Sequence, residues 1–166
     1  MKMRTTTGRE FDPTSVTMND LSIHDIAHAL SHLCRYGGHL PRFYSVAQHS
    51  VYAANYASVR NFGSHVELQC LLHDASEAYL GDIIRPLKVA LPEYREIEER
   101  VQRVIFERYC DPAQPIYETL IHEADEWVLQ MEFVVFRDFA DGWEPARARQ
   151  EFMTTFERLR GSNAAV

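Results

Sequence analysis

Three titratable residues, His73, Asp74 and Glu77, follow one another in the mostly apolar stretch CLLHDASEAYLGD at 70–82. Helical spacing over about 66–80 predicts that the large apolar side chains share one arc and that the three titratable groups lie on the opposite arc. An imidazole beside a carboxylate is a pair of metal ligands, and a second carboxylate one turn later is placed to move a proton. The alternative is that all three side chains face bulk water.

Two residues elsewhere in the chain could join that pair, because a divalent ion takes ligands from several elements. His49 lies three residues after Val46 and four before Ala53, on a small apolar stripe, so its ring is expected to point inward. A hydrogen-bonded core histidine would show the same pattern. Asp125 borders the apolar stripe of HEADEWVLQME at 122–132, where a boundary carboxylate paired with an arginine is the alternative.

The resulting order, His49, then His73-Asp74, then Asp125, resembles the ligand order of the HD-domain metal-dependent phosphohydrolases. The surrounding segments resemble the family as well. SVAQHS is similar to its first-histidine helix, LLHDASEAYLGDIIRPLK to its HD helix with the trailing GDxxxPxK loop, and HEADE to the helix of the last aspartate. The resemblance covers about residues 22–140. It is closest to the small bacterial and phage enzymes that hydrolyse deoxynucleotides, which include 5′-deoxynucleotidases and compact dATP triphosphohydrolases.

This resemblance implies a metal site made by His49, His73, Asp74 and Asp125, with Glu77 as a general acid or base. Two neutral imidazoles and two carboxylates form a mixed nitrogen and oxygen site, which favours Zn²⁺, Mn²⁺, Co²⁺ or Fe²⁺ over Mg²⁺. Such an ion lowers the pKa of a bound water from about 16 towards about 7 and so supplies hydroxide at neutral pH. For Glu77 the alternative role is an outer hydrogen-bond acceptor that orients a ligand.

Four further residues are expected to bind the substrate. Arg35 and Lys88 occupy positions that, by the resemblance, reach the phosphates, and Asp82 occupies the position that lies against the sugar and favours deoxyribose. Arg85 adds a cation in the same loop as Lys88. Each of these charges, taken singly, would also fit a solvated surface. Tyr36 follows Arg35 where the monophosphatases of the family have a tryptophan, so the contacts to the base stay open.

The resemblance therefore implies an enzyme that cleaves deoxynucleotides at the 5′ phosphoester. The leading expectation is a dNTP triphosphohydrolase that acts on a purine such as dATP and releases the deoxynucleoside and triphosphate. A 5′-deoxynucleotidase acting on dNMPs is the alternative. A nucleotide-binding regulatory module without turnover is the alternative from a different class, and the intact Glu77 speaks against it. The sequence does not determine the base preference, the physiological metal or the number of ions.

Helical periodicity predicts an all-α fold, a compact single-domain helical bundle of the HD type that spans residues 1–166. Helices are expected from Ser22 to before YGGHLP, from the S-x-x-Q capping box at Ser45 onward, over 66–80, over PEYREIEERVQRVIFERY, from 116 into the 130s, and over 145–160. GDIIRPLKVALP is expected to be a loop, and residues 1–20 a tail or a short edge element. The core of the domain is expected to cover about 22–140.

A second doublet, His24-Asp25, is not expected to bind metal. His24, His28 and His32 recur every four residues and would form a narrow band on the solvent side of their helix. Asp25 has another use at the N3 position of that helix, near the positive end of the helix dipole.

The composition is that of a folded globule, with 46% hydrophobic and 25% charged residues. The net charge of −7 argues against a nucleic-acid polymer as partner and leaves a small-molecule deoxynucleotide held by a local cationic pocket. The three cysteines include no CxxC pair and are expected to be reduced core residues. No apolar signal region and no membrane-spanning stretch appears, so we expect a cytoplasmic protein, in the host cytoplasm if a phage encodes it. Amphipathic helices and the habits of the resembled family favour a homo-oligomer.

Overall fold

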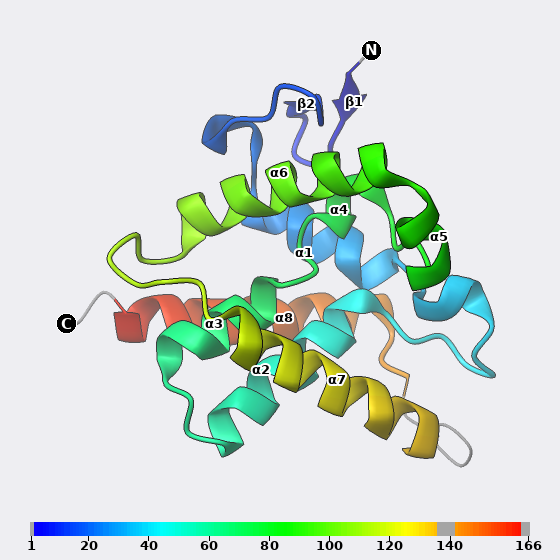
Figure 1. Cartoon of the computed structure of the whole chain (residues 1–166), viewed down its shortest axis with the longest axis vertical. Helices are drawn as coiled ribbons and strands as arrows, with labels where there is room; N and C mark the ends of the chain where they lie inside the picture. The colour runs from blue at the N-terminus through cyan, green and yellow to red at the C-terminus, as the bar shows by residue number, and fades with distance from the viewer. Residues whose placement is uncertain (1, 136–141, 164–166) are drawn as a thin grey trace.

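The computed structural model describes residues 2–135 and 142–163, apart from the side chains of 133–135 and 162–163. The fold is all-α as predicted, with one small antiparallel hairpin near the N-terminus (Figure 1). The elements in chain order are β1 Met3–Arg4, β2 Glu10–Phe11, the 3₁₀ turn η1 Met18–Asp20, α1 Ile23–His32, the 3₁₀ turn η2 Arg35–Gly38, α2 Val46–Val59, α3 Ser64–Leu72, α4 Glu77–Leu80, α5 Arg85–Ala90, α6 Pro92–Tyr109, α7 Glu118–Val135 and α8 Pro145–Asn163.

The expected domain of 1–166 and its core of 22–140 both include residues 136–141, which lie outside the described residues. The single-domain assignment therefore stays a prediction. No helix within the described part of the chain is long and apolar enough to cross a membrane.

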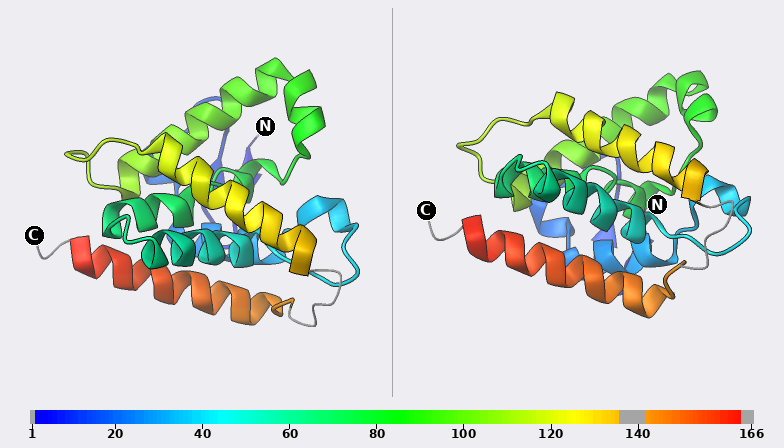
Figure 2. Two further views of the ribbon diagram at one scale, coloured as in Figure 1. Left: turned by 60° about the horizontal axis from the view of Figure 1, so that its bottom comes forward. Right: turned by 90° about the horizontal axis from the view of Figure 1, so that it is seen from below.

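Helices α2 and α3 pack side by side, and the other long helices surround them (Figure 2). On one side α8 lies against α1, α2 and α3, and on another side α7 packs on α2 and α3. α6 contacts α3 and η1. This arrangement brings the start of α2, the end of α3 and the middle of α7 together.

A large apolar core joins elements from both ends of the chain. Phe11 of β2, Leu30 of α1, Leu71 of α3, Ile105 of α6 and Phe152 of α8 are all buried in one cluster. Burial of each such side chain contributes about 1.5–3 kcal/mol before the entropic cost of ordering it. The N-terminal hairpin and α8 are therefore part of the same packed structure as the central helices.

A second apolar cluster, between α2, α3 and α7, consists largely of small side chains. Ala53, Cys70 and Ala124 are buried in it, one from each helix. Small side chains let helices pack closely, so α7 lies against α2 here. As a result Asp125, the neighbour of Ala124, approaches His49 on α2.

Ser45 begins α2 as predicted, because its Oγ accepts a hydrogen bond from the backbone N–H of Gln48 at 3.2 Å. The side chain of Gln48 binds the segment before α8, since its Oε1 accepts a hydrogen bond from the backbone N–H of Trp143 at 2.8 Å. One residue thus contributes to the start of α2 and attaches a distant part of the chain to it.

α1 begins after Ser22 as predicted, but the carboxylate of Asp25 binds a partner that the sequence did not suggest. It accepts hydrogen bonds from the backbone N–H of Thr7 at 2.8 Å and from Thr7 Oγ1 at 2.6 Å. Asp25 therefore fastens the N-terminal hairpin to α1.

The histidine band of α1 agrees only in part with the expectation. His24 and His32 are exposed, whereas His28 is half-buried and its Nδ1 has no hydrogen-bond partner among the described residues. Burial, with the nearby His32, lowers the pKa of His28 below its usual value.

Two parts of the prediction are wrong. The helix expected over 66–80 is interrupted, because α3 ends at Leu72 and α4 begins only at Glu77. A side chain of α6 binds the backbone between them. The loop expected over 81–92 contains the short helix α5, whose first turn holds Pro86 with its fixed, helix-compatible φ.

Candidate metal centre

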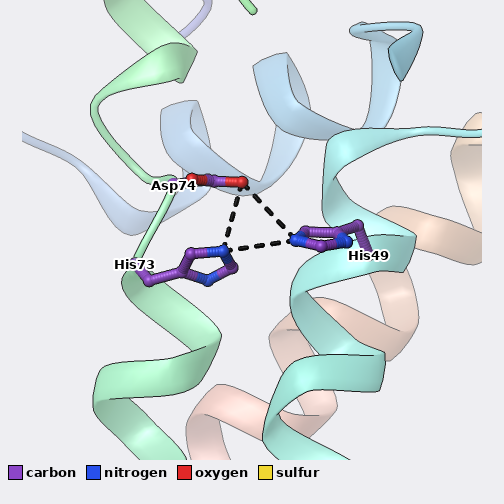
Figure 3. Close-up of side chains that lie close together, drawn as sticks. All are labelled: His49, His73 and Asp74. Carbon is purple, nitrogen blue, oxygen red and sulfur yellow. Dashed lines mark hydrogen bonds and ion pairs between the residues drawn. The ribbon is translucent and has the colours of Figure 1, made fainter. Parts of the chain in front are cut away.

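Four side chains from three helical segments meet at one point. His49 stands in the first turn of α2, His73 and Asp74 follow the end of α3, and Asp125 lies in α7. Figure 3 shows the rings of His49 and His73 and the carboxylate of Asp74 turned toward one another. The structure brings together the four residues that the sequence suggested as ligands, and their binding of a metal stays a prediction.

Ligand atoms of His49, His73 and Asp74 all lie within 4.8 Å of one another, and Asp125 joins them through its contacts with the two imidazoles. His49 Nε2 and His73 Nε2 lie 3.2 Å apart, and Asp74 Oδ2 lies 3.6 Å from the first and 3.2 Å from the second. Asp125 Oδ1 lies 3.2 Å from His49 Nε2 and 3.7 Å from His73 Nε2. Donor atoms held tetrahedrally at about 2.0–2.2 Å from one zinc ion would lie about 3.3–3.6 Å apart. Each carboxylate therefore contacts both imidazoles at the spacing that a shared cation requires.

The tautomers of the His49 and His73 rings also favour the binding of a cation between them. His73 Nδ1 lies 2.7 Å from the backbone carbonyl oxygen of Cys70, and His49 Nδ1 lies 2.7 Å from Glu132 Oε1. Both partners are acceptors, so each Nδ1 carries the hydrogen and, in a neutral ring, each Nε2 presents a lone pair. Two lone pairs and two carboxylates that face one another at these distances repel, unless a proton or a metal ion lies between them.

The charges at the centre raise the pKa of His73 and lower the pKa values of Asp74 and Asp125. Burial opposes the protonated form of His73, but the charges of Asp74 and Asp125 and their hydrogen bonds raise its pKa well above the usual value. Burial would raise the pKa of Asp74 and of Asp125, yet the two imidazoles lower both pKa values below the usual range. A divalent cation can take the place of the proton that His73 would otherwise hold.

Glu132 is a member of the centre that the sequence analysis missed. It lies in α7 seven residues after Asp125, is almost completely buried, and accepts the hydrogen bond of His49 Nδ1. Burial opposes its ionisation, but the bond from His49 and the charge of Arg35 lower its pKa. The spacing of seven, two helical turns, was the available signal, since it places both carboxylates on the same face of the helix.

Comparison with known proteins agrees with this geometry. The family model described as "HD domain" matches residues 39–135, more than half of the chain, and that range includes all four candidate ligands. The chain belongs to the HD-domain family. HD domains bind divalent metals, so the family and the cluster together indicate a metal-dependent phosphohydrolase.

Two relatives of this HD domain have no activity in their descriptions. "Uncharacterized protein YfdR" of Escherichia coli (strain K12) is 39% identical over 130 residues, which cover 78% of this chain and 69% of the relative. An uncharacterized protein of Rhodobacter capsulatus is 36% identical over 115 residues, which cover 66% of this chain and 59% of the relative. These similarities support membership of the HD-domain family but do not indicate a substrate.

Arg35 lies beside the metal centre of the HD domain. Its Nη1 lies 3.5 Å from Asp74 Oδ2 and its Nη2 lies 3.4 Å from Glu132 Oε2. The next residue, Tyr36, donates its hydroxyl hydrogen to the same oxygen of Glu132 and has a left-handed backbone with φ of 57°. A bulky residue rarely adopts that conformation, so its bond to Glu132 helps to hold the turn that presents Arg35.

Glu77, the expected acid or base of the HD domain, is buried three residues after Asp74. Its Oε1 accepts a hydrogen bond from Lys88 Nζ at 2.9 Å, and Lys88 also donates to Glu98 Oε1 at 2.7 Å. Its Oε2 has no hydrogen-bond partner within the described residues. Burial and the charge of Asp74 raise the pKa of Glu77 well above its usual value, and Lys88 opposes that rise. The raised pKa favours the protonated form of this carboxyl more than in an exposed glutamate.

A pocket of about 330 Å³ connects the metal centre with the expected substrate residues. Its lining contains Arg35, Tyr36, Asp74, Asp82, Ile83, Ile84, Arg85, Pro86, Lys88, Asp125 and Leu129. All four residues predicted to bind substrate thus line one pocket together with two of the candidate ligands, and substrate binding itself stays a prediction. Burial raises the pKa of Asp82, whereas Arg85 is exposed and pairs with Glu126 at 3.0 Å.

A larger groove of about 730 Å³ also begins at His73 and Asp74, and it runs along α6. Carboxylates outnumber basic side chains in its lining, which holds Glu98, Glu99 and Glu107 of α6 among six carboxylates but only Lys88, Arg103 and His73 as bases. The smaller pocket is therefore the better site for a phosphate, because its lining holds Arg35, Arg85 and Lys88.

Proposed function

We propose that this HD domain is a divalent-metal-dependent hydrolase that cleaves deoxynucleotides at the 5′ phosphoester. The leading substrate is a dNTP such as dATP, with the deoxynucleoside and triphosphate as products. The observation that carries the proposal is the approach of His49 Nε2 and His73 Nε2 to 3.2 Å, flanked by two carboxylates, beside a pocket lined by three cations.

The three cations support a polyphosphate substrate by their arrangement. The exposed fraction of the side chain is 11% for Arg35, 22% for Lys88 and 65% for Arg85, so positive charge extends from the buried centre to the pocket mouth. A chain of phosphates that leads outward from the metal would meet a cation at each depth.

A second candidate, a 5′-deoxynucleotidase acting on dNMPs, is supported by the pairing of the same cations. Arg35 contacts Asp74 and Glu132, and Lys88 contacts Glu77 and Glu98. Carboxylates thus already balance much of the positive charge, which favours a substrate with a single phosphate.

The chemistry follows from the places of the side chains. A bound divalent ion would polarise a phosphoryl oxygen and make a water acidic. Arg35 and Lys88 neutralise charge on the phosphates, and Asp82 lies against the sugar. As water adds to phosphorus and the bond to the 5′ oxygen breaks, the carboxyl of Glu77 protonates that oxygen and regains a proton from the water.

The test is hydrolysis by metal-free protein reloaded separately with Mn²⁺, Co²⁺ or Zn²⁺. A panel of dNTPs and dNMPs is incubated with each form, and ion chromatography separates triphosphate from orthophosphate. Triphosphate from dNTPs supports the leading proposal, and orthophosphate from dNMPs alone supports the second. In ¹⁸O-labelled water the label must appear in the phosphate product, because attack is at phosphorus.

A chain that binds metal and nucleotides but releases no phosphate species with any of these ions would instead be a regulatory module. An Asp125→Asn variant controls for contaminating phosphatases, since any activity that it retains in full does not arise from this centre.

We also infer a homo-oligomer located in the cytoplasm, with a small-molecule substrate and with no nucleic-acid polymer or membrane as partner. Four large apolar side chains on or beside α5, Ile84, Leu87, Val89 and Leu91, are exposed and support self-association. Light scattering that gives the mass of one chain at micromolar concentration would exclude the oligomer.

A further inference from the structure

The residues that carry His73 and Asp74 depart from a regular helix. Between α3 and α4 the backbone bonds run from residue i to i−3, from Ala75 N to Leu72 O at 3.0 Å and from Glu77 N to Asp74 O at 3.1 Å. The apolar spacing of 66–80 predicts no such change.

The side-chain amide of Gln102, on α6, binds at this point. Its Nε2 donates to the carbonyl oxygen of Leu72 at 2.7 Å, and its Oε1 accepts from the backbone N–H of Ser76 at 3.1 Å. In an α-helix the N–H of residue 76 would bond directly to the carbonyl of residue 72. The amide of Gln102 has therefore been inserted between the donor and the acceptor of one helical hydrogen bond.

Insertion of a side chain into the helical ladder is a known cause of a local opening or kink. Consecutive residues of a regular helix do not face each other. Nevertheless His73 Nε2 and Asp74 Oδ2 lie only 3.2 Å apart. The opening at 72–76 allows the two side chains to converge.

We propose that Gln102 is a positioning residue of the metal centre, which holds the helix open at 72–76 and so directs His73 and Asp74 toward one ion. The inference rests on the metal centre of the proposed function. Gln102 lies on α6, which supplies none of the four ligands, so it acts through the turn and not through the ion.

The chain contains a matched control for this proposal. Gln69, on α3, makes the same kind of bridge: its Nε2 donates to Pro115 O at 2.9 Å and its Oε1 accepts from Tyr117 N at 2.9 Å. It connects α3 with the segment before α7 and does not touch the turn at 72–76. Leucine at either position removes two hydrogen bonds of similar length.

The experiment compares Gln102→Leu, Gln69→Leu and the unchanged protein, each stripped of metal and titrated with Co²⁺ without any nucleotide. We expect the Kd for Co²⁺ to rise about 10- to 100-fold in Gln102→Leu, as for loss of an outer partner of a ligand. In Gln69→Leu it should stay within about 2-fold, as for a site without shared partners. Thermal melting should show at least as large a loss of stability in Gln69→Leu, because Gln69 is fully buried and Gln102 only half-buried.

Backbone chemical shifts and amide exchange of residues 73–76 provide a second readout in the metal-free proteins. Gln102→Leu should give a regular helical pattern with slow exchange at Ser76, while Gln69→Leu should retain the open pattern. An unchanged opening in Gln102→Leu, or equal Co²⁺ affinity in the two variants, overturns the proposal. If Gln102→Leu does not fold, Gln102→Asn is tested by the same Co²⁺ titration and amide measurements. Its shorter side chain cannot reach both Leu72 O and Ser76 N.

These readouts separate this proposal from the proposed function. If the unchanged protein binds Co²⁺ but hydrolyses no nucleotide, the hydrolase assignment fails and the role of Gln102 is still measured. If it binds no Co²⁺, the metal centre fails and with it the positioning role, whatever the chemical shifts show.

Discussion

Glu132 Oε1 lies 2.7 Å from His49 Nδ1, so the helix that supplies Asp125 also fixes the ring of the histidine opposite. This bond sets which nitrogen of His49 carries the hydrogen and leaves Nε2 free to bind an ion. It also connects the centre with the turn at Arg35 and Tyr36, because Glu132 binds those two side chains as well. One buried carboxylate therefore orients a candidate ligand and the first expected phosphate contact.

Removal of that carboxylate should weaken metal binding. We expect Glu132→Ala to raise the Kd for Co²⁺ by about 10- to 100-fold, because the ring of His49 loses the acceptor that orients it. Glu132→Gln should have a smaller effect, since its amide oxygen still accepts. Calorimetric titration measures both. Glu123→Gln, a half-buried residue of α7 that accepts a hydrogen bond from Tyr56 instead, is the control, and an equal effect of the two Gln variants would contradict the orienting role.

Glu77→Gln should separate chemistry from metal binding. The amide keeps the size of the side chain but cannot exchange a proton, so we expect kcat to fall by about 10²-fold or more. The Kd for the metal should change little, because Glu77 is not among the four ligands. Steady-state kinetics and Co²⁺ absorption spectra test the two statements. Normal turnover in the variant would leave Glu77 without a catalytic role.

Metal should stabilise the protein increasingly as the pH rises. In the metal-free protein the pKa of His73 is raised above its usual 6.5, so its contribution to stability is complete below pH 6.5 and is lost as the pH rises through the raised pKa. A bound ion replaces that proton and removes the loss. At 100 times Kd the ion adds about 2.7 kcal/mol, which is about 5–10 °C in Tm for a chain of this size.

Differential scanning calorimetry between pH 6 and pH 8.5, with Mn²⁺ or with a chelator, measures this difference in Tm. We expect the difference to widen with pH in the unchanged protein and to vanish in His73→Asn. A difference that narrows as the pH rises would contradict the assignment of His73 as a ligand.

Asp82→Ala should reduce the discrimination between deoxyribose and ribose. Asp82 lines the pocket beside the metal centre, and a carboxylate against the sugar leaves little room for a 2′ hydroxyl. We expect the ratio of kcat/KM for dATP over ATP to fall by about 10-fold. Competition assays with both nucleotides measure the ratio. Glu99→Ala, in the acidic groove along α6, should leave it unchanged.

Most of the site could be predicted from local patterns. The S-x-x-Q box at Ser45 begins α2 and sets where His49 stands, and the spacing around Asp125 predicts its place at the edge of a buried stripe. These signals are local, because capping and helical periodicity depend on residues within a few positions of one another. They are sufficient for the all-α fold, whereas the four candidate ligands were singled out by the resemblance to the HD-domain family.

The features that the sequence did not predict arise from contacts between distant residues. Glu132 and His49 are 83 positions apart, and Gln102 lies 30 positions from Leu72. No local pattern shows that a side chain of α6 will compete for a helical hydrogen bond of the HD segment. The sequence by itself thus determined which residues have the chemistry of ligands and which helical segments lie next to them. Only the tertiary structure decided how the helix opens between them and which buried acceptors orient the imidazoles, because those hydrogen bonds exist only after the helices have packed.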